Sequence, residues 1–285
     1  MLVAAHVFEI VVLIGGPLWA ARVLARRWAL PLGVFGIGAL TFVFGQVLQM
    51  ALAWTIRRGF EAGALPLPST ETAPLVSALL AGVAAALTDE PVRLWALRRY
   101  LPALTSPRTG ALLGLGHGGA QAMLGGLLVL WMATLALLFH GQTFDDMRQL
   151  GLEGRAAVRL GMKVFAWWEQ SPLDVLGTLG REAAIVVMHL GLATAVACAP
   201  SRGYRYLLVA IAAHAVAGSA IAYAQAAAPD VWGVLTTYGG AASLGALAGF
   251  WASRGAWSDG PGASEGAGEG SGSDEASDEP SSSAK

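Results

Sequence analysis

The sequence has 285 residues, of which 55% are hydrophobic and only 13% are charged. A water-soluble globular domain carries about 25% charged residues, so this composition excludes a protein that faces water on all sides. The single cysteine, Cys198, excludes an internal disulfide framework and a cysteine-based zinc finger. No alternating strand pattern favours a membrane β-barrel. We therefore predict an all-α, polytopic helical membrane protein.

Seven apolar segments are long enough to cross a bilayer as helices, which need about 20 apolar residues each. Backbone amides within lipid must be hydrogen-bonded inside their own segment, so each is predicted to be a helix. The predicted spans are 2–24, 30–54, 73–97, 110–139, 173–199, 205–228 and 232–252.

The distribution of basic residues predicts the orientation of these spans. Ten arginines lie in or beside the loops on one side, from Arg22 to Arg254. The other side holds Arg57 and Arg58, with further basic residues in one long connection that carries less weight. Because short cytoplasmic loops are enriched in Lys and Arg, we predict an N-terminus outside and a C-terminus in the cytoplasm.

Outside the spans, two segments differ in composition. The connection 140–172 mixes charges with Phe144, Phe165, Trp167 and Trp168, which predicts an interfacial amphipathic segment on the outer face. The segment 255–285 contains mainly Gly, Ser, Asp and Glu, which predicts a disordered acidic cytoplasmic tail after a transmembrane domain of residues 1–254. No basic patch suited to nucleic acid is present.

Ionisable side chains inside spans are expensive, and each is therefore a functional candidate. Glu90, His117, His189 and His214 lie eight to ten residues from the predicted cytoplasmic ends of four different spans. At about 1.5 Å per residue, all four lie roughly 12–15 Å below the cytoplasmic surface. We therefore predict one layer that contains a carboxylate and three imidazoles.

The chemistry of this layer suits hydrolysis. Neutral imidazole is a preferred zinc ligand, and three protein ligands with one water form the usual catalytic zinc site. A divalent ion lowers the pKa of its water, and a nearby carboxylate can take the proton. Arg93 follows Asp89 and Glu90 on one helical face, so it can pair with one acid and leave the other free.

Four short motifs lie within a core of about 73–228: DEPVR at 89–93, GLGHGGAQ at 114–121, the Glu182-to-His189 stretch and His214. In this order they resemble the YhfC family of predicted intramembrane metalloproteases, which is related to CAAX-type prenyl-protease and PrsW-type membrane peptidases. The resemblance implies a multi-pass protein of a prokaryotic cell membrane that hydrolyses a peptide bond of a membrane or membrane-associated protein.

The resemblance also implies roles for individual residues. Asp89 and Glu90 would activate water. Arg93 would pair with one of these acids, and Gln121, one turn from His117, could hydrogen-bond the His117 ring. His117, His189 and His214 would bind a divalent metal, Zn2+, or polarise the scissile carbonyl.

The sequence departs from this family's pattern at three positions: Asp89 and Gln121 stand where glutamate is usual, and Gly218 stands where CAAX-type relatives have asparagine. These departures leave two alternatives to the peptidase open. One is a catalytically degenerate, membrane-embedded binding protein, and the other is a proton- or cation-coupled carrier, because buried His and Glu also form proton relays.

Overall fold

The structure is a computed structural model and describes residues 1–142, 146, 154–227 and 231–254. The chain divides into two compact units, Met1–Ser253 and Arg254–Lys285, and every helix below belongs to the first unit. The predicted disordered tail at 255–285 lies outside the described residues, as does most of the first half of the 140–172 connection, including Phe144.

The described residues form helices, as predicted. The elements are α1 (Leu2–Arg27), α2 (Gly33–Glu61), α3 (Ala73–Tyr100), the 3-10 turn η1 (Pro102–Leu104), α4 (Pro107–Leu138), α6 (Gly154–Trp168), α7 (Pro172–Arg202), α8 (Arg205–Ala227) and α9 (Val231–Ser253). Within the described part of the chain, six helices are long and apolar enough to cross a membrane: α1, α2, α3, α4, α7 and α8. The seventh predicted span forms α9, which is not one of these six, and the orientation stays a prediction.

Local sequence explains where two of the central helices begin. Ser106 caps α4 by accepting a hydrogen bond from the amide of Thr109, and Pro107 follows at the first helical position. Ser171 and Asp174 form a capping box at the start of α7, where Pro172 follows the cap. Both starts combine a side-chain acceptor for free amides with a proline that needs no amide partner.

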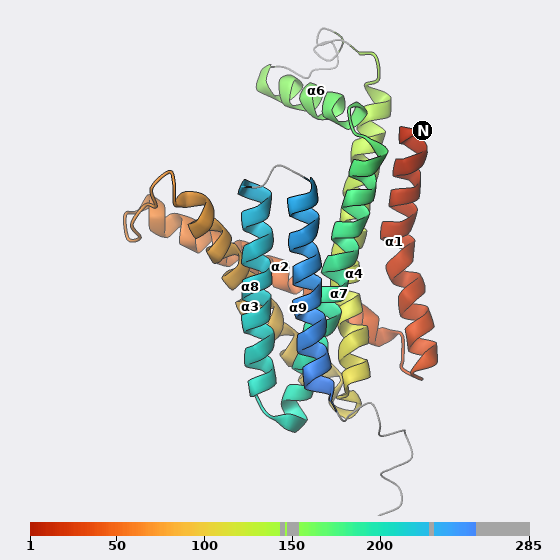
Figure 1. Cartoon of the computed structure of the whole chain (residues 1–285), viewed down its shortest axis with the longest axis vertical. Coiled ribbons are helices and arrows are strands. Elements are labelled where there is room, and N and C mark those ends of the chain that lie inside the picture. Colours follow the sequence, from red (N-terminus) through yellow and green to blue (C-terminus); the bar gives the residue numbers. More distant parts are fainter. Residues whose placement is uncertain (143–145, 147–153, 228–230, 255–285) are drawn as a thin grey trace, which may run out of the picture. The chain divides into compact units, whose positions relative to one another are not determined.

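Glycines allow α4 to pack closely between α2 and α7 (Figure 1). A Cβ atom at Gly110 would lie 2.6 Å from the carbonyl oxygen of Ala193 on α7. A Cβ atom at Gly116, on another face of α4, would collide with the carbonyl group of Phe35 on α2. Small residues at helix contacts let backbones approach closely within a membrane. The backbone of α4 therefore lies close to both α2 and α7.

In Figure 1, α2 runs obliquely behind the other helices, whereas α6 lies across the end where α1 begins. Val158, Met162 and Phe165 form an exposed apolar face of α6. Trp167 packs against Ala133 and Ala136 of α4 on its other side. Such a pattern is typical of helices at a membrane surface, and the interfacial position of the 140–172 connection stays a prediction.

Candidate functional site

Six buried ionisable side chains from α3, α4, α7 and α8 meet in one network, which we call the polar network. Each is at most 3% exposed. The members are Asp89, Glu90, Arg93, His117, His189 and His214. The structure therefore brings together the carboxylate and the three imidazoles that their sequence depth placed in one layer.

Glu90 lies at the centre of a charge-assisted hydrogen-bond chain. Its Oε1 atom accepts from Arg93 Nη1 at 2.6 Å and from His214 Nδ1 at 2.7 Å. Because Nδ1 of His214 carries its proton toward the carboxylate, the neutral ring keeps a lone pair on Nε2. Arg93 thus pairs with one of the two adjacent acids, as its spacing predicted.

Arg93 also determines the tautomer of His189. The Nη2 atom of Arg93 donates to Nδ1 of His189 over 2.7 Å. A guanidinium has only donors, so Nδ1 of His189 must be the acceptor. The neutral ring then carries its proton on Nε2, and His189 offers a hydrogen-bond donor to any group bound beside it.

His117 is oriented oppositely by Thr41 of α2. The hydroxyl of Thr41 donates to the Gly38 carbonyl oxygen at 2.6 Å, so this hydroxyl accepts from Nδ1 of His117 at 3.1 Å. The lone pair of His117 therefore lies on Nε2, 3.3 Å from Oδ2 of Asp89. Nε2 of His117 and the other carboxylate oxygen of Asp89, Oδ1, both lack a hydrogen-bond partner.

The two unpartnered acceptors are costly in a buried site, since each unsatisfied polar group destabilises a protein by about 1–3 kcal/mol. A molecule with two hydrogens to donate would satisfy both, and water is the smallest such molecule. Donors lie in the same network: Nε of Arg93 is also buried and unpartnered. The ring centroids of His117 and His189 are 4.7 Å apart, and those of His189 and His214 are 5.3 Å apart.

Sequence reasoning missed the contribution of α2. A Cβ atom at Gly45 would collide with Oδ1 of Asp89, so only glycine lets α2 lie directly over this carboxylate. Gly38, Thr41 and Gly45 are spaced three and four residues apart and share one helical face. This small-residue spacing, with one hydroxyl at its centre, is the signal that could have identified the helix.

Two other sequence candidates lie outside the polar network. Gln121 is half-buried one turn along α4 from His117, and no hydrogen bond joins the two described side chains. Glu182 instead pairs with Arg181, with Nε and Oε1 3.4 Å apart.

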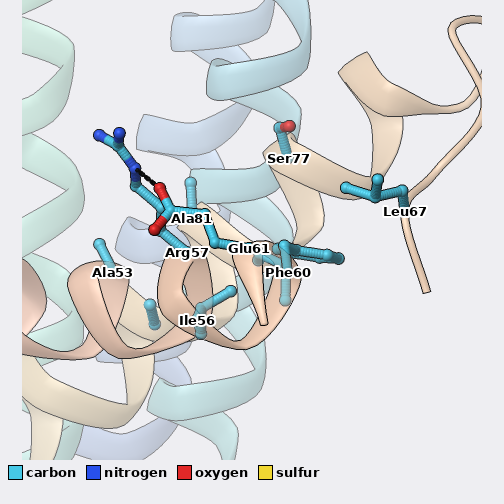
Figure 2. A pocket seen from close by; sticks show the side chains of 10 residues that line it. Ala53, Ile56, Arg57, Phe60, Glu61, Leu67, Ser77 and Ala81 are labelled. Carbon is cyan, nitrogen blue, oxygen red and sulfur yellow. Dashed lines mark hydrogen bonds and ion pairs between the residues drawn. The ribbon is translucent and has the colours of Figure 1, made fainter. Parts of the chain in front are cut away.

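Two cavities lie between α2 and α3. One, of about 470 Å³, is lined by Thr41 and by apolar side chains that include Phe44 and Trp95. The other, of about 590 Å³, lies near the end of α2, where Figure 2 shows Phe60 and the ion-paired Arg57 and Glu61. Thr41 lines the first cavity and also hydrogen-bonds to His117 of the polar network, so it connects the apolar cavity with buried polar groups.

The sequence matches the family described as YhfC intramembrane metalloprotease over residues 10–235. The chain belongs to this family. The chain matches no curated protein and no solved structure. Membership in YhfC and the six apolar helices together make this a multi-pass membrane protein.

The YhfC description implies a divalent metal ion. Whether the predicted histidine ligands can hold such an ion depends on which ring nitrogens carry free lone pairs. A zinc ion needs one lone pair from each ring, at about 2.0–2.1 Å. His117 and His214 each offer Nε2, but the accepting nitrogen of His189 is occupied by the guanidinium of Arg93. Within the described residues, no three His, Cys, Asp or Glu side chains are placed to hold a metal ion. This arrangement does not fit a metal ion, and ligation of zinc by these histidines stays a prediction.

Proposed function

We propose that this YhfC member is an intramembrane endopeptidase that hydrolyses a peptide bond of a membrane or membrane-associated protein, with Asp89 as the base for water. The observation that carries the proposal is the pair of unpartnered acceptors at Asp89 and Nε2 of His117. Each of the two adjacent acids keeps one unpartnered oxygen, Oδ1 of Asp89 and Oε2 of Glu90. The other oxygen of Glu90 is held by Arg93 and His214, whereas the other oxygen of Asp89 faces His117, so we assign Asp89 as the base.

In this reaction, water donates one hydrogen toward Asp89 and the other toward His117. As the water oxygen attacks the peptide carbonyl carbon, Asp89 takes its proton. The carbon–nitrogen bond then breaks, and the same proton passes to the departing amine. Positioned general bases contribute about 10²- to 10⁴-fold to such steps.

Donors for the developing oxyanion come from Arg93 and His189. The free Nε of Arg93 and the Nε2 proton of His189 are both available for this role. Fixed donors of this kind in a site without water stabilise negative charge in the transition state. Glu90 acts as a positioning residue, because it anchors the guanidinium.

A substrate helix reaches this chemistry from the α2–α3 side in our proposal. The apolar cavity at Thr41, Phe44 and Trp95 suits an unwound stretch of a membrane segment. The peptidase core would be residues 73–228 with α2 as the adjoining wall. The site would lie in the cytoplasmic half of a prokaryotic cell membrane, with the N-terminus outside.

The test is cleavage of single-span membrane peptides in proteoliposomes, with new termini identified by mass spectrometry. Asp89→Asn should reduce cleavage by about 10³-fold without loss of folding. Glu182→Gln, which changes a buried carboxylate outside the polar network, should cleave at the wild-type rate. Equal cleavage by Asp89→Asn and the wild type would refute the assignment.

The predicted zinc ion has its own test. Elemental analysis of the purified protein should be compared with the variant in which His117, His189 and His214 are all alanine. One zinc per chain in the first sample and none in the second would establish the metal site.

The two alternatives give different outcomes in the same assay. Capture of peptides without any product in both the wild type and Asp89→Asn would support the binding protein. Ion flux that needs no peptide would support the carrier.

A further inference from the structure

A second group of buried polar side chains surrounds a cavity of about 470 Å³ at the end of the bundle covered by α6. We call it the α6 cavity, and its lining comes from α1, α4, α6 and α7 together with the loop residue Gln170. Arg181, which lines it, precedes His189 by eight residues of α7, or about 12 Å along the helix axis. The α6 cavity is therefore separate from the polar network.

The wall formed by α1 contributes acceptors. Nδ1 of His6 lies 2.8 Å from Oε2 of Glu9, and both residues are at most 4% exposed. Because Nδ1 donates to this carboxylate, Nε2 of the neutral His6 ring keeps a lone pair, and it has no partner. The carboxylate and the free ring nitrogen together suit a ligand that carries several N–H donors.

The residues of α6 and α7 in the lining contribute donors. Trp167 stacks on His6 with ring centroids 4.5 Å apart, and its buried Nε1–H group has no acceptor. Lys163 and Arg181 add two cationic groups to the lining. Glu182 does not line the cavity, and its Oε1 lies 3.4 Å from Nε of Arg181, so it partly neutralises the charge of Arg181. These donors suit an anionic oxygen-rich group such as a phosphate.

The surroundings indicate a lipid as the source of the ligand. The exposed apolar face of α6, formed by Val158, Met162 and Phe165, is typical of a helix that lies at a membrane surface. Leu128 and Met132 of α4 provide an apolar part of the cavity wall. A ligand here would place its polar end among charges and its apolar end against aliphatic side chains.

We propose that the α6 cavity binds the phosphoethanolamine headgroup of a membrane lipid. The phosphate accepts from Lys163, Arg181 and the indole of Trp167. The primary ammonium donates to Glu9 and to Nε2 of His6. A zwitterionic headgroup matches a cavity whose lining includes two cations and a carboxylate. The proposal does not depend on peptide hydrolysis.

Lipid retention measured by native mass spectrometry tests this site. The full-length protein is reconstituted with equal amounts of phosphatidylethanolamine and phosphatidylcholine, whose quaternary nitrogen has no hydrogen to donate. Phosphatidylethanolamine should be retained about tenfold better, the ratio expected for a charge-assisted hydrogen bond. Equal retention of the two lipids would overturn the proposal.

Variants of the lining residues test which side chains bind the ammonium and which bind the phosphate of the headgroup. Glu9→Gln should abolish the preference between the two lipids, because it removes the charge that faces the ammonium. Lys163→Gln should reduce retention of both lipids about tenfold, and Trp167→Phe should reduce it severalfold while keeping an aromatic ring on His6. Arg159→Gln removes a neighbouring cation of α6 that does not line the cavity, and it should change nothing.

Two further outcomes would also overturn the proposal. One is an equal loss of lipid in Arg159→Gln and Lys163→Gln, which would indicate general charge attraction. The other is displacement of the lipid by free phosphoethanolamine at an equal concentration, which would indicate a soluble ligand. Thermal unfolding of each variant, compared with the wild type, separates loss of the site from loss of the fold.

Discussion

The two buried polar clusters of this molecule differ in how their charges are neutralised. In the polar network, Arg93 and Glu90 of α3 form an ion pair with no exposed surface, and a second helix, α8, adds His214 to the same carboxylate oxygen. In the α6 cavity, the buried pair of His6 and Glu9 stays within α1, and the two cations of the lining, Lys163 and Arg181, belong to α6 and α7.

This difference corresponds to the two roles that we propose, chemistry in the polar network and binding in the α6 cavity. In the polar network, Arg93 and Glu90 neutralise each other, and the unpartnered buried atoms belong to Asp89, Glu90, Arg93 and His117. The α6 cavity is lined by donors and acceptors from different helices, which a zwitterion could join. Burial by itself does not distinguish the two, because the carboxylates of both are at most 3% exposed.

Removing one carboxylate from each cluster gives the largest expected contrast. Glu90→Ala leaves the guanidinium of Arg93 buried without a counter-ion and should destabilise the protein by about 3–5 kcal/mol. Glu9→Ala leaves only a histidine, which can stay neutral, and should destabilise it by about 1–2 kcal/mol. Unfolding by denaturant in one detergent measures both.

The double variant Glu90→Ala/Arg93→Met is the control for this comparison. Removing both charges should recover much of the stability that Glu90→Ala loses, because no unpaired charge remains. A double variant no more stable than Glu90→Ala would show that the unpaired guanidinium is not the cause of the loss. A Glu9→Ala variant less stable than Glu90→Ala would contradict the expected order of the two clusters.

Two glycines of α4 provide the next contrast. A Cβ atom at Gly114 would collide with the carbonyl oxygen of His189 and lie 2.7 Å from Cα of Leu190. Gly114→Ala should therefore push α7 away from α4, destabilise the protein by about 1–3 kcal/mol and slow cleavage. A Cβ atom at Gly125 would meet only Glu182, at an ordinary 3.8 Å.

Gly125→Ala should consequently be neutral or stabilise the helix by up to about 1 kcal/mol. Thermal unfolding and cleavage assays of the two variants test the pair. Equal behaviour of Gly114→Ala and Gly125→Ala would show that close approach of α4 and α7 is not what positions His189.

The threonine hydroxyls of the two regions should contribute unequally to the rate of cleavage. Thr41→Val keeps the shape of the side chain but removes the acceptor for Nδ1 of His117, so the ring loses its fixed tautomer. Cleavage should fall about tenfold, equivalent to about 1.4 kcal/mol. Thr178→Val near the α6 cavity removes only a bond to the Asp174 carbonyl oxygen and should leave cleavage unchanged. A Thr41→Val variant with the wild-type rate would remove Thr41 from the mechanism.

The sequence predicted the helices and the common depth of the polar network along them because both follow from counting residues along the chain. The length of each apolar segment determines its span, and the count of residues from a charged end determines depth. Glu90 and His214 are far apart in sequence, yet both depths follow from this count. Their meeting at 2.7 Å agrees with it.

The roles within the network could not be predicted in the same way. Asp89 and Glu90 are adjacent in sequence, but only their rotation about α3 makes one pair with Arg93 and the other face His117. Thr41 was missed because its importance depends on a close approach of α2 that glycines permit. The α6 cavity was missed because His6 and Trp167 lie on different helices, and the hydrophobic pattern of a sequence does not predict which helices pack together.

Substitution of Gln121 should have the smallest effect on cleavage, and it tests directly whether sequence spacing assigned a residue its correct role. Sequence spacing places it one turn from His117, where the family resemblance implies a role beside the ring. In the structure, the two nitrogens of His117 face Thr41 and Asp89 instead. Gln121→Ala should therefore change cleavage by less than about twofold and stability by less than about 0.5 kcal/mol, whereas His117→Ala should abolish cleavage. A tenfold loss in Gln121→Ala, measured in the same proteoliposomes, would mean that the amide reaches the ring during catalysis and that the partners of His117 change when substrate binds.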